Sequence, residues 1–241
     1  EQLFDRVGQA RFISTLDLKS GYHLIPVPEH VRNKTAFWCG QRLVRFKRMP
    51  FGLAGSPAFF QLVMDRTLGD LVNKKGKRFT AVYLDDIIII SDTFEEHLEH
   101  VDAVLQRLTE CFGPHCVHPD KSIFVSSRVE YLGYILEAGG RLGPHPAKIK
   151  AFADLPSPGS LTALRSALSL FCYYRAFIGN FSQLAAPLHE LLRADAIPAG
   201  TNGFKRAWTT VHEEAFKQLK TALCRPGLAI RNADHSRPFF L

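Results

Sequence analysis

Two adjacent carboxylates interrupt a strongly apolar segment of the chain. Residues 79–92, FTAVYLDDIIIISD, carry Asp85 and Asp86 at their centre. Aspartate is depleted in strands, and an ionised carboxylate that leaves water without a partner costs several kcal/mol. A turn would place both side chains at the tip of a hairpin with buried arms. Because neighbouring negative charges repel, such a tip favours a bound cation, and carboxylate oxygens favour Mg²⁺ or Mn²⁺.

Asp17 has a similar setting, since it interrupts the strand pattern of FISTLDLKSGYH and precedes a turn at Ser20 and Gly21. Three carboxylates from two strand ends can hold two divalent ions about 4 Å apart, the arrangement that supports in-line displacement at phosphorus. The alternative for the pair taken alone is an Asp-rich hairpin turn without chemistry.

Strands and a helix must bring these carboxylates together. Strand patterns cover RFISTLDL and GYHLIPV, and KTAFWC followed by RLVRFK predicts a hairpin across Gly40 and Gln41. A helix is predicted next, with Ser56 as N-cap and Pro57 at its first position. Its apolar face contains Phe60, Met64, Leu68 and Leu71.

The segment after the Asp pair predicts the clearest helix of the chain. Thr93 and Glu96 have the spacing of a capping box. The apolar residues that follow at helical spacing are Leu98, Val101, Leu105, Leu108 and Phe112. SIFV and VEYLGYIL then predict two short strands. Residues 1 to about 137 therefore predict an α+β fold, an antiparallel sheet with helices packed on one face.

The rest of the chain is predicted to be mainly helical. A Pro- and Gly-rich stretch, GPHPAKIKAFADLPSPGS, marks a domain boundary. Two apolar stripes follow, separated by a break at Gly179 and Asn180: Leu161, Leu164, Leu168 and Phe171, then Leu184, Leu188 and Leu191. A polar loop, ADAIPAGTNG, precedes a helix capped by Thr210 and Glu213, and SRPFFL predicts the start of a strand.

The charge of the chain permits a polyanionic partner. The formal net charge is +7 and the pI is about 9.3. Basic residues gather in RLVRFKR and KKGKR and continue through Arg141, Lys148 and Lys150. A solvated surface explains each cluster equally well when it is taken alone.

Composition and cysteine usage favour a globular intracellular protein. The 241 residues are 46% hydrophobic, no apolar run reaches the roughly 18 residues of a membrane span, and the N-terminus lacks a signal-peptide pattern. Five scattered cysteines without a CxxC pair argue against a disulfide framework. Cys111, His115, Cys116 and His118 are close enough in sequence to suggest zinc. However, their spacing matches no common finger, and Gly113 with Pro114 predicts a helix end.

Five motifs occur in order: LDLKSGYH, RMPFGLAGSPAFFQ, YLDD, HPDKSIF and YLGYIL. Together they resemble the palm motifs of reverse transcriptases, above all those of gypsy-like long-terminal-repeat retrotransposon polyproteins. LRSALSLFCYYRAFIGNFSQLAAPLHELL is similar to the thumb of that group, and WTTVHEEAFKQLKTAL to the connector before its RNase H domain. The resemblance implies a palm with partial fingers at 1–140, a helical thumb at 141–197, and a connector at 198–241 leading into an RNase H-like domain.

The resemblance implies an RNA-directed DNA polymerase that extends a primer 3′-hydroxyl with dNTPs. Asp17 and Asp85 would be ligands of two Mg²⁺ ions, with Mn²⁺ as a substitute. Asp86 would be the adjoining carboxylate, and its direct metal contact is the one expected least. Tyr22 would be the aromatic gate that rejects a 2′-hydroxyl by a clash, whereas its alternative is a core tyrosine.

Further roles are implied for the remaining motif residues. Phe51, where retroviral enzymes usually have Gln, would pack on the nucleotide, and Gly52 would let the backbone come close. Lys121 resembles the lysine proposed in the family as proton donor to pyrophosphate, although a surface turn lysine is equally favoured. The residues that resemble the primer grip are Tyr131, Leu132, Gly133 and Tyr134, and their alternative is an edge hairpin.

The expected partners are an RNA/DNA template–primer duplex, dNTPs, and the rest of a Pol polyprotein with its fingers, RNase H and integrase. No membrane partner is expected, and the expected location is the cytoplasm, in virus-like particles. No RNase H activity is expected from these residues. One alternative is an inactive or domesticated remnant that binds nucleic acid. The other is an RNA-dependent RNA polymerase, against which Tyr22 counts because that position would normally be small or polar there.

Overall fold

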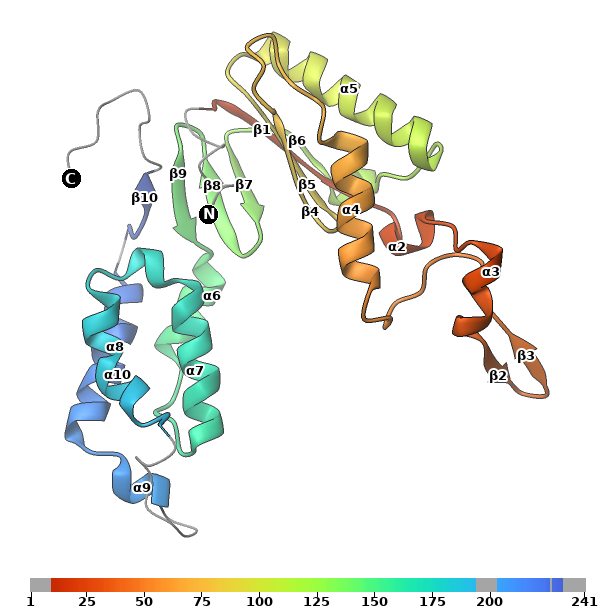
Figure 1. Cartoon of the computed structure of the whole chain (residues 1–241). Coiled ribbons are helices and arrows are strands. Elements are labelled where there is room, and N and C mark those ends of the chain that lie inside the picture. Colours follow the sequence, from red (N-terminus) through yellow and green to blue (C-terminus); the bar gives the residue numbers. More distant parts are fainter. Residues whose placement is uncertain (1–9, 194–202, 226, 232–241) are drawn as a thin grey trace. The chain divides into compact units, whose positions relative to one another are not determined.

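The computed structural model describes residues 10–193, 203–225 and 227–231. Within these residues the chain forms two compact units (Figure 1). The first unit comprises residues 10–132 and 136–140, and the second comprises residues 133–135 and the described part of 141–231. Among the described helices, none is both long and apolar enough to cross a membrane.

The first unit is built on an antiparallel sheet of four strands in the order β4-β5-β1-β6. The strands are β1 (Phe12–Asp17), β4 (Thr80–Tyr83), β5 (Asp86–Ser91) and β6 (Ile123–Ser126). β1 and β5 pair without a break, from Phe12 opposite Ser91 to Asp17 opposite Asp86. β4 and β5 form the hairpin that the sequence predicts for residues 79–92.

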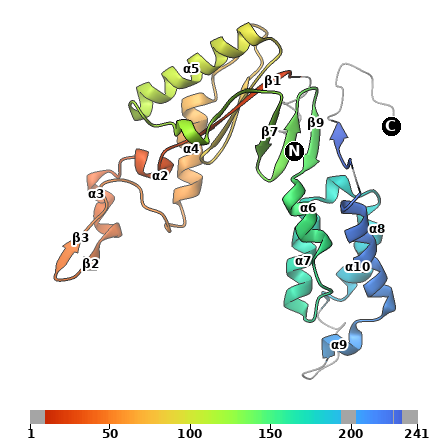
Figure 2. The same cartoon turned by 180° about the vertical axis from the view of Figure 1, so that it is seen from behind.

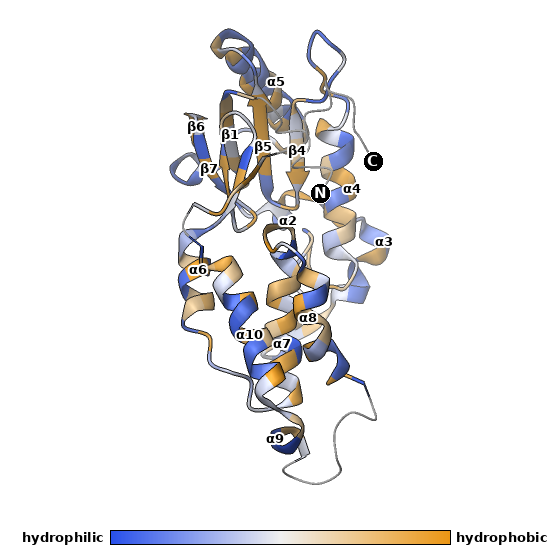
Figure 3. Ribbon diagram, turned by 90° about the vertical axis from the view of Figure 1, so that its left-hand side faces the viewer, coloured by the Kyte–Doolittle hydropathy of each residue, from blue (hydrophilic) through white to orange (hydrophobic). Residues whose placement is uncertain are grey.

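Helices α4 (Ser56–Leu68) and α5 (Phe94–Phe112) cover one face of this sheet (Figures 1 and 2). Ile87 and Ile89 of β5 project into the core that both helices share, because alternate residues of a strand face the same way. Ile88 faces the opposite way and is also buried, so β5 is apolar on both faces (Figure 3). The predicted α+β fold with helices on one sheet face is confirmed.

The start of α4 differs by one residue from the prediction. Gly55 is the N-cap, and Ser56 is the first helical residue. The buried Ser56 hydroxyl donates to the Pro50 carbonyl at 3.4 Å and does not cap a helix N–H. Gly55 is therefore the N-cap residue. Pro57 is the second residue of α4, one position later in the helix than predicted.

α5 begins as predicted, since Thr93 Oγ1 accepts a hydrogen bond from the Glu96 N–H at 3.2 Å. The predicted apolar stripe is wrong in one place, because Leu98 is 51% exposed while His97 and His100 are buried. A pattern of apolar residue types cannot identify histidines that are buried in the core, where their ring nitrogens form hydrogen bonds.

The strand predicted for GYHLIPV is wrong over its first half. Ser20 has left-handed backbone geometry, with φ of 56°, and turns the chain directly after β1 into the short helix α2 (Gly21–Leu24). The chain continues through α3 (Glu29–Arg32) and a 3₁₀ turn (Asn33–Thr35). The predicted hairpin across Gly40 then follows as β2 (Phe37–Cys39) and β3 (Arg42–Val44).

VEYLGYIL forms two strands where one was expected, β7 (Arg128–Tyr131) and β8 (Tyr134–Glu137). Leu132 and Gly133 between them have φ of 49° and 76°, the geometry of a two-residue hairpin turn. β9 (Arg141–Pro144) follows, and it pairs with β10 (Ile230–Arg231).

The second unit is mainly helical. Its helices are α6 (Pro146–Ala153), α7 (Leu161–Tyr173), α8 (Phe181–Glu190), α9 (Gly203–Ala207) and α10 (Thr210–Leu223), with a 3₁₀ turn at Arg175–Phe177. α7 and α8 confirm the two predicted stripes, and α10 packs against α8 and α6. α6 lies inside the stretch for which no helix is predicted. Residues 194–202 of the predicted polar loop and the strand predicted in SRPFFL lie outside the described residues.

The cap of α10 is Thr209, one residue before the predicted Thr210. Its partner is His212, whose Nδ1 accepts from the Thr209 N–H at 3.0 Å. Glu213, the predicted partner, instead accepts hydrogen bonds from the Ser157 hydroxyl at 2.8 Å and from Trp208 Nε1 at 3.0 Å.

Two buried histidines connect α5 to the sheet. His97 Nε2 lies 2.7 Å from Ser14 Oγ on β1, and its Nδ1 lies 2.8 Å from Ser91 Oγ on β5. Ser91 Oγ also lies 2.7 Å from His100 Nδ1, and the His100 ring stacks on Phe79 with centroids 3.7 Å apart. Burial and then the neighbouring His100 lower the pKa of His97 to about 4, so His97 is neutral at pH 7.

We expect His97→Gln to destabilise the protein by about 1–3 kcal/mol, because a buried serine hydroxyl loses its partner. The pKa of His97 is lower in the folded state, about 4, than the ordinary value of 6.5. The folded state therefore loses stability relative to the unfolded state as the pH falls from 6.5 towards about 4. Denaturant unfolding at about pH 7 and about pH 5 should therefore show a smaller acid-induced loss of stability in the variant than in the wild type. Exposed His30 provides the control, His30→Gln. An equal acid-induced loss in wild type and His97→Gln would contradict the role of this network.

Candidate nucleotidyl-transfer site

The turn between β4 and β5 carries one aspartate, and the start of β5 carries the other. Leu84 has φ of 53°, a left-handed geometry that is unusual for a residue other than glycine. Asp85 follows in the turn, and Asp86 is the first residue of β5. The predicted turn is therefore present, although only Asp85 lies within it. Because Asp86 is the strand partner of Asp17, their side chains lie on the same face of the sheet.

The three carboxylates form one electrostatic cluster. Burial, followed by the charges of Asp17 and Asp86, raises the pKa of Asp85 above its usual value. Partial desolvation of its carboxyl group, followed by the charge of Asp17, raises the pKa of Asp86 above its usual value. Asp85 and Asp17 are half-buried, whereas Asp86 is exposed. A concentration of negative charge at one end of the sheet is therefore a property of the fold.

The environment of Asp85 is compatible with a bound cation. Its Oδ1 is buried and has no hydrogen-bond partner within the described part of the chain. Gly21 lies directly against it, since a Cβ at Gly21 would collide with Asp85 Oδ1. A hard, unpaired carboxylate oxygen suits Mg²⁺ or Mn²⁺. The side chains are not arranged as a finished site, because no group of three His, Cys, Asp or Glu residues within 10–193, 203–225 and 227–231 encloses a metal position.

The backbone of Asp17 is held from both sides by the HPDKSIF motif, for which the sequence predicted a role of Lys121 but not this support. Asp17 accepts a hydrogen bond from the His118 N–H at 2.8 Å and donates its own N–H to Ser122 Oγ at 3.3 Å. The Ser122 hydroxyl also donates to the His118 carbonyl at 2.8 Å. His118, a candidate zinc ligand by sequence, thus contributes its backbone to the carboxylate site. The HPDKSIF motif was the only available signal for this segment.

Lys121 lies on the 3₁₀ turn Pro119–Lys121, between the two residues that hold Asp17. Its side chain is exposed, and no hydrogen bond or ion pair of Nζ is present among the described residues. The structure therefore brings the Lys121 backbone close to Asp17 without a side-chain contact to the carboxylates.

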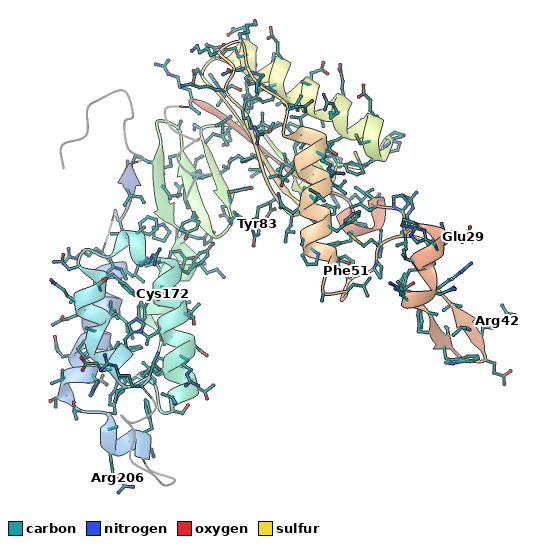
Figure 4. The ribbon with its side chains drawn as sticks, in the orientation of Figure 1. Glu29, Arg42, Phe51, Tyr83, Cys172 and Arg206 are labelled. Atoms are coloured by element: carbon teal, nitrogen blue, oxygen red, sulfur yellow. The ribbon has the colours of Figure 1, made fainter. Side chains whose placement is uncertain are left out.

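Tyr22 lies on α2 directly after Gly21 and packs between two phenylalanines. Its ring centroid is 5.1 Å from that of Phe51 and 5.1 Å from that of Phe60. Phe51 is 63% exposed, on the loop that precedes α4 (Figure 4). Gly52 beside it has φ of 88°, which favours glycine. The structure thus brings Tyr22 and Phe51 together next to the residue that contacts Asp85.

Tyr131 also contacts the hairpin. Its hydroxyl donates to the Asp86 carbonyl at 3.2 Å, and the residue is buried. Burial and then the Asp86 charge raise the pKa of the Tyr131 hydroxyl, so it remains a donor at any physiological pH. The sequence predicted a primer-grip role for Tyr131 and gave no sign of this support for the aspartate strand.

Two other primer-grip candidates, Gly133 and Tyr134, have hydrogen bonds with tyrosines of the helical unit. The Tyr174 hydroxyl donates to the Gly133 carbonyl at 3.2 Å, and the Tyr134 hydroxyl donates to the Tyr173 carbonyl at 2.9 Å. Leu132, with its positive φ, completes the turn. These contacts fix the shape of the turn.

Both basic clusters are partly paired with acidic side chains. Lys74 and Lys75 of KKGKR pair with Glu99 at 3.3 Å and Asp92 at 3.6 Å. Arg45 of RLVRFKR pairs with Glu29 at 3.3 Å, and Arg42 projects from the end of the β2–β3 hairpin (Figure 4). Each cluster is therefore partly neutralised by its own unit, although exposed pairs of this kind contribute little to stability.

Comparison with known proteins identifies one family. The family described as "Reverse transcriptase (RNA-dependent DNA polymerase)" matches residues 1–136. The retrovirus-related Pol polyprotein from transposon gypsy of Drosophila melanogaster is 34% identical over 238 residues, which are 98% of this chain and 22% of that protein. The transposon Tf2-3 polyprotein of Schizosaccharomyces pombe is 31% identical over 241 residues, 100% of this chain and 17% of that protein. The chain thus spans about a fifth of the length of these relatives.

Solved structures give the same picture. A foamy viral protease-reverse transcriptase in complex with double-stranded DNA has a TM-score of 0.78 and 27% identity, over 93% of this chain and 37% of that chain. The foamy viral protease-reverse transcriptase in complex with an RNA/DNA hybrid has a TM-score of 0.74 and 26% identity, over 92% of this chain and 29% of that chain.

The raised pKa of Asp85 leads to a prediction about stability. A carboxyl with a raised folded-state pKa favours folding at low pH, and this contribution is lost as the pH rises through the folded pKa. Asp85→Asn removes the ionised group, so in a chelating buffer at about pH 8 we expect a higher Tm than in the wild type. Each kcal/mol gained corresponds to roughly 2–4 °C in a domain of this size.

The difference should shrink as the pH approaches 3.8, the ordinary value for Asp. Differential scanning fluorimetry across this pH range measures the effect. The control is Asp92→Asn at the other end of the β4–β5 hairpin, where Asp92 pairs with Lys75. A lower Tm for Asp85→Asn at about pH 8 would count against an uncompensated charge at this position.

Proposed function

The chain belongs to the reverse transcriptase (RNA-dependent DNA polymerase) family, and from this premise we propose that it is the polymerase core of a retrotransposon Pol polyprotein. It extends a primer 3′-hydroxyl with dNTPs on an RNA or DNA template. One observation carries the proposal: the β1–β5 register sets the carboxylates of Asp17 and Asp86 side by side, with half-buried Asp85 in the adjoining turn.

Asp17 and Asp85 are the proposed metal ligands, and Asp86 is the adjoining carboxylate. Two Mg²⁺ ions, or Mn²⁺ in their place, would activate the 3′-hydroxyl and neutralise charge on the leaving pyrophosphate. The unpartnered Oδ1 of Asp85 supports this ligand role, because an ionised buried oxygen requires a partner. The backbone hydrogen bonds of Asp17 keep its carboxylate at a fixed strand end.

Tyr22 is the proposed gate against ribonucleotides. Its ring packs against both Phe51 and Phe60, so it cannot move aside without repacking. Phe51 presents an exposed ring beside it and would contact the nucleotide by packing, with Gly52 shaping the loop. Lys121 is proposed to donate a proton to pyrophosphate, although it has no contact that supports this role.

The wider assignment follows the family. We propose palm and partial fingers for residues 1–140, a thumb for 141–197 and a connector for 198–241. The segment Tyr131, Leu132, Gly133 and Tyr134 would hold the primer end. The foamy viral relative is described in complex with double-stranded DNA and with an RNA/DNA hybrid, which supports a template–primer duplex as the partner of this chain. The remaining Pol domains and a location in virus-like particles belong to the same proposal.

The main test is primer extension on poly(rA) by the full-length protein with Mg²⁺ and dTTP. Asp85→Asn should reduce the rate of incorporation by at least about 100-fold. Even the mutation of a residue that only supports a metal ligand typically lowers metal affinity or activity by about 10–100-fold. Asp92→Asn, whose carboxylate pairs with Lys75 away from the site, should retain activity.

Primer extension combined with a binding measurement distinguishes an active polymerase from an inactive nucleic-acid-binding remnant. An electrophoretic mobility shift with the primer–template duplex measures binding independently of incorporation. If the wild-type protein binds the duplex but incorporates no dTTP, the polymerase proposal fails and an inactive nucleic-acid-binding remnant takes its place.

The gate has its own test. Tyr22→Ala should increase the use of rNTPs relative to dNTPs by at least about 10-fold, because a single steric group in a pocket contributes that much discrimination. Tyr22→Phe keeps the ring and its packing, so it should discriminate like the wild type. Single-nucleotide incorporation with paired rNTP and dNTP substrates gives both ratios. Unchanged sugar selectivity in Tyr22→Ala would remove Tyr22 from this role.

A further inference from the structure

Gln61 of α4 contacts the backbone of Val82 and Leu84, where the aspartate turn begins. Its Nε2 donates to the Val82 carbonyl at 3.1 Å, and its Oε1 accepts from the Leu84 N–H at 2.8 Å. Leu84 is the residue with left-handed geometry, and Asp85 follows it directly. One side chain therefore supports the backbone immediately before the half-buried carboxylate.

The orientation of the Gln61 amide is determined by its three partners. Nε2 also donates to Asp65 Oδ1 at 3.0 Å, one helical turn along α4. Val82 O and Asp65 Oδ1 are acceptors, whereas the Leu84 N–H is a donor, so a reversed amide would place like groups together in all three contacts. The amide thus has one satisfied orientation, and Asp65 helps to select it.

The turn needs such support for two physical reasons. A non-glycine residue in the left-handed region is strained and persists only when its surroundings require it. In addition, β4 and β5 pair only as far as Tyr83 and Asp86, so the Leu84 N–H lies beyond the ladder.

We propose that Gln61 is a positioning residue for Asp85, which it holds in place through the backbone of Val82 and Leu84. Gln61 touches neither carboxylate of the aspartate pair, so its effect passes entirely through the turn. The consequence for catalysis rests on the proposed polymerase function, whereas the effect on the turn can be measured without activity.

Two substitutions at Gln61 separate its hydrogen bonds from its packing. Gln61→Met keeps the length and helix preference of the side chain and removes both contacts with the turn. Gln61→Glu keeps an acceptor for the Leu84 N–H but sets a carboxylate oxygen against Val82 O and Asp65. Gln106→Met on α5 is the matched control, because exposed Gln106 also donates to an aspartate one helical turn away, Asp102 Oδ2 at 2.9 Å, and has no hydrogen bond to a strand.

Hydrogen exchange measures how readily the backbone of the turn opens. In the full-length protein it is followed by mass spectrometry at the amides of residues 82–86. Gln61→Met should accelerate exchange there by about 10-fold, which corresponds to a loss of about 1.4 kcal/mol of net hydrogen-bond stabilisation. Exchange in the rest of β5 should not change. Gln106→Met should leave the turn at the wild-type rate.

Single-turnover primer extension measures the catalytic consequence. Gln61→Met should reduce the maximal rate of dTTP incorporation by about 10–100-fold, because small displacements of a reacting group have effects of this size. The apparent Kd for dTTP and for the duplex should change by less than about threefold, since Gln61 does not contact either ligand in this proposal. A general loss of structure would instead weaken all three values.

The outcomes are separable. Accelerated exchange confined to the turn supports the inference, and a selective loss of rate with it supports the positioning of Asp85. Unchanged exchange in Gln61→Met overturns the inference, as does a wild-type incorporation rate in that variant when the wild-type protein is active. If the wild-type protein incorporates no dTTP while exchange at the turn still responds to Gln61→Met, the polymerase proposal fails and the holding of the turn by Gln61 stands.

Discussion

β1 and β5 pair in a register that sets Asp17 opposite Asp86, and the carboxylate site depends on that register. A slip by one residue would turn every side chain of one strand to the opposite face and separate the two carboxylates. His97 opposes such a slip, because its ring hydrogen-bonds to both Ser14 of β1 and Ser91 of β5. The apolar run of β5, which makes the aspartates look out of place, keeps the strand buried in the sheet.

Repulsion among the carboxylates of Asp17, Asp85 and Asp86 destabilises this arrangement. Hydrogen bonds between uncharged groups and the backbone of Asp17 and Asp86 stabilise it. His118 and Ser122 hold Asp17 from both sides, and Tyr131 holds the Asp86 carbonyl. Each such bond contributes about 1 kcal/mol, and none of them neutralises a carboxylate. The site is therefore held in shape while its negative charge remains available to a cation, which is what the family chemistry requires.

The sequence predicted the features that residue types encode directly. The family, the β4–β5 hairpin and the Thr93 cap of α5 are confirmed. The helix caps before α4 and α10 were misplaced by one residue: Gly55 takes the place of Ser56, whose hydroxyl bonds to Pro50, and Thr209 takes the place of the adjacent Thr210. The buried histidines and the supports of Asp17 could not be predicted, because their contacts join residues about a hundred positions apart or use the backbone alone.

Departures from local preference concentrate around the carboxylates, which is how functional sites differ from the scaffold that carries them. Leu84 adopts a left-handed geometry, Asp85 keeps a buried oxygen without a partner, and Phe51 exposes most of its ring. Ser20 turns the chain with a positive φ immediately before Gly21 reaches Asp85. Each departure alone has an ordinary structural explanation. Their meeting at one end of one sheet has a common explanation in the cation and nucleotide site that we propose there.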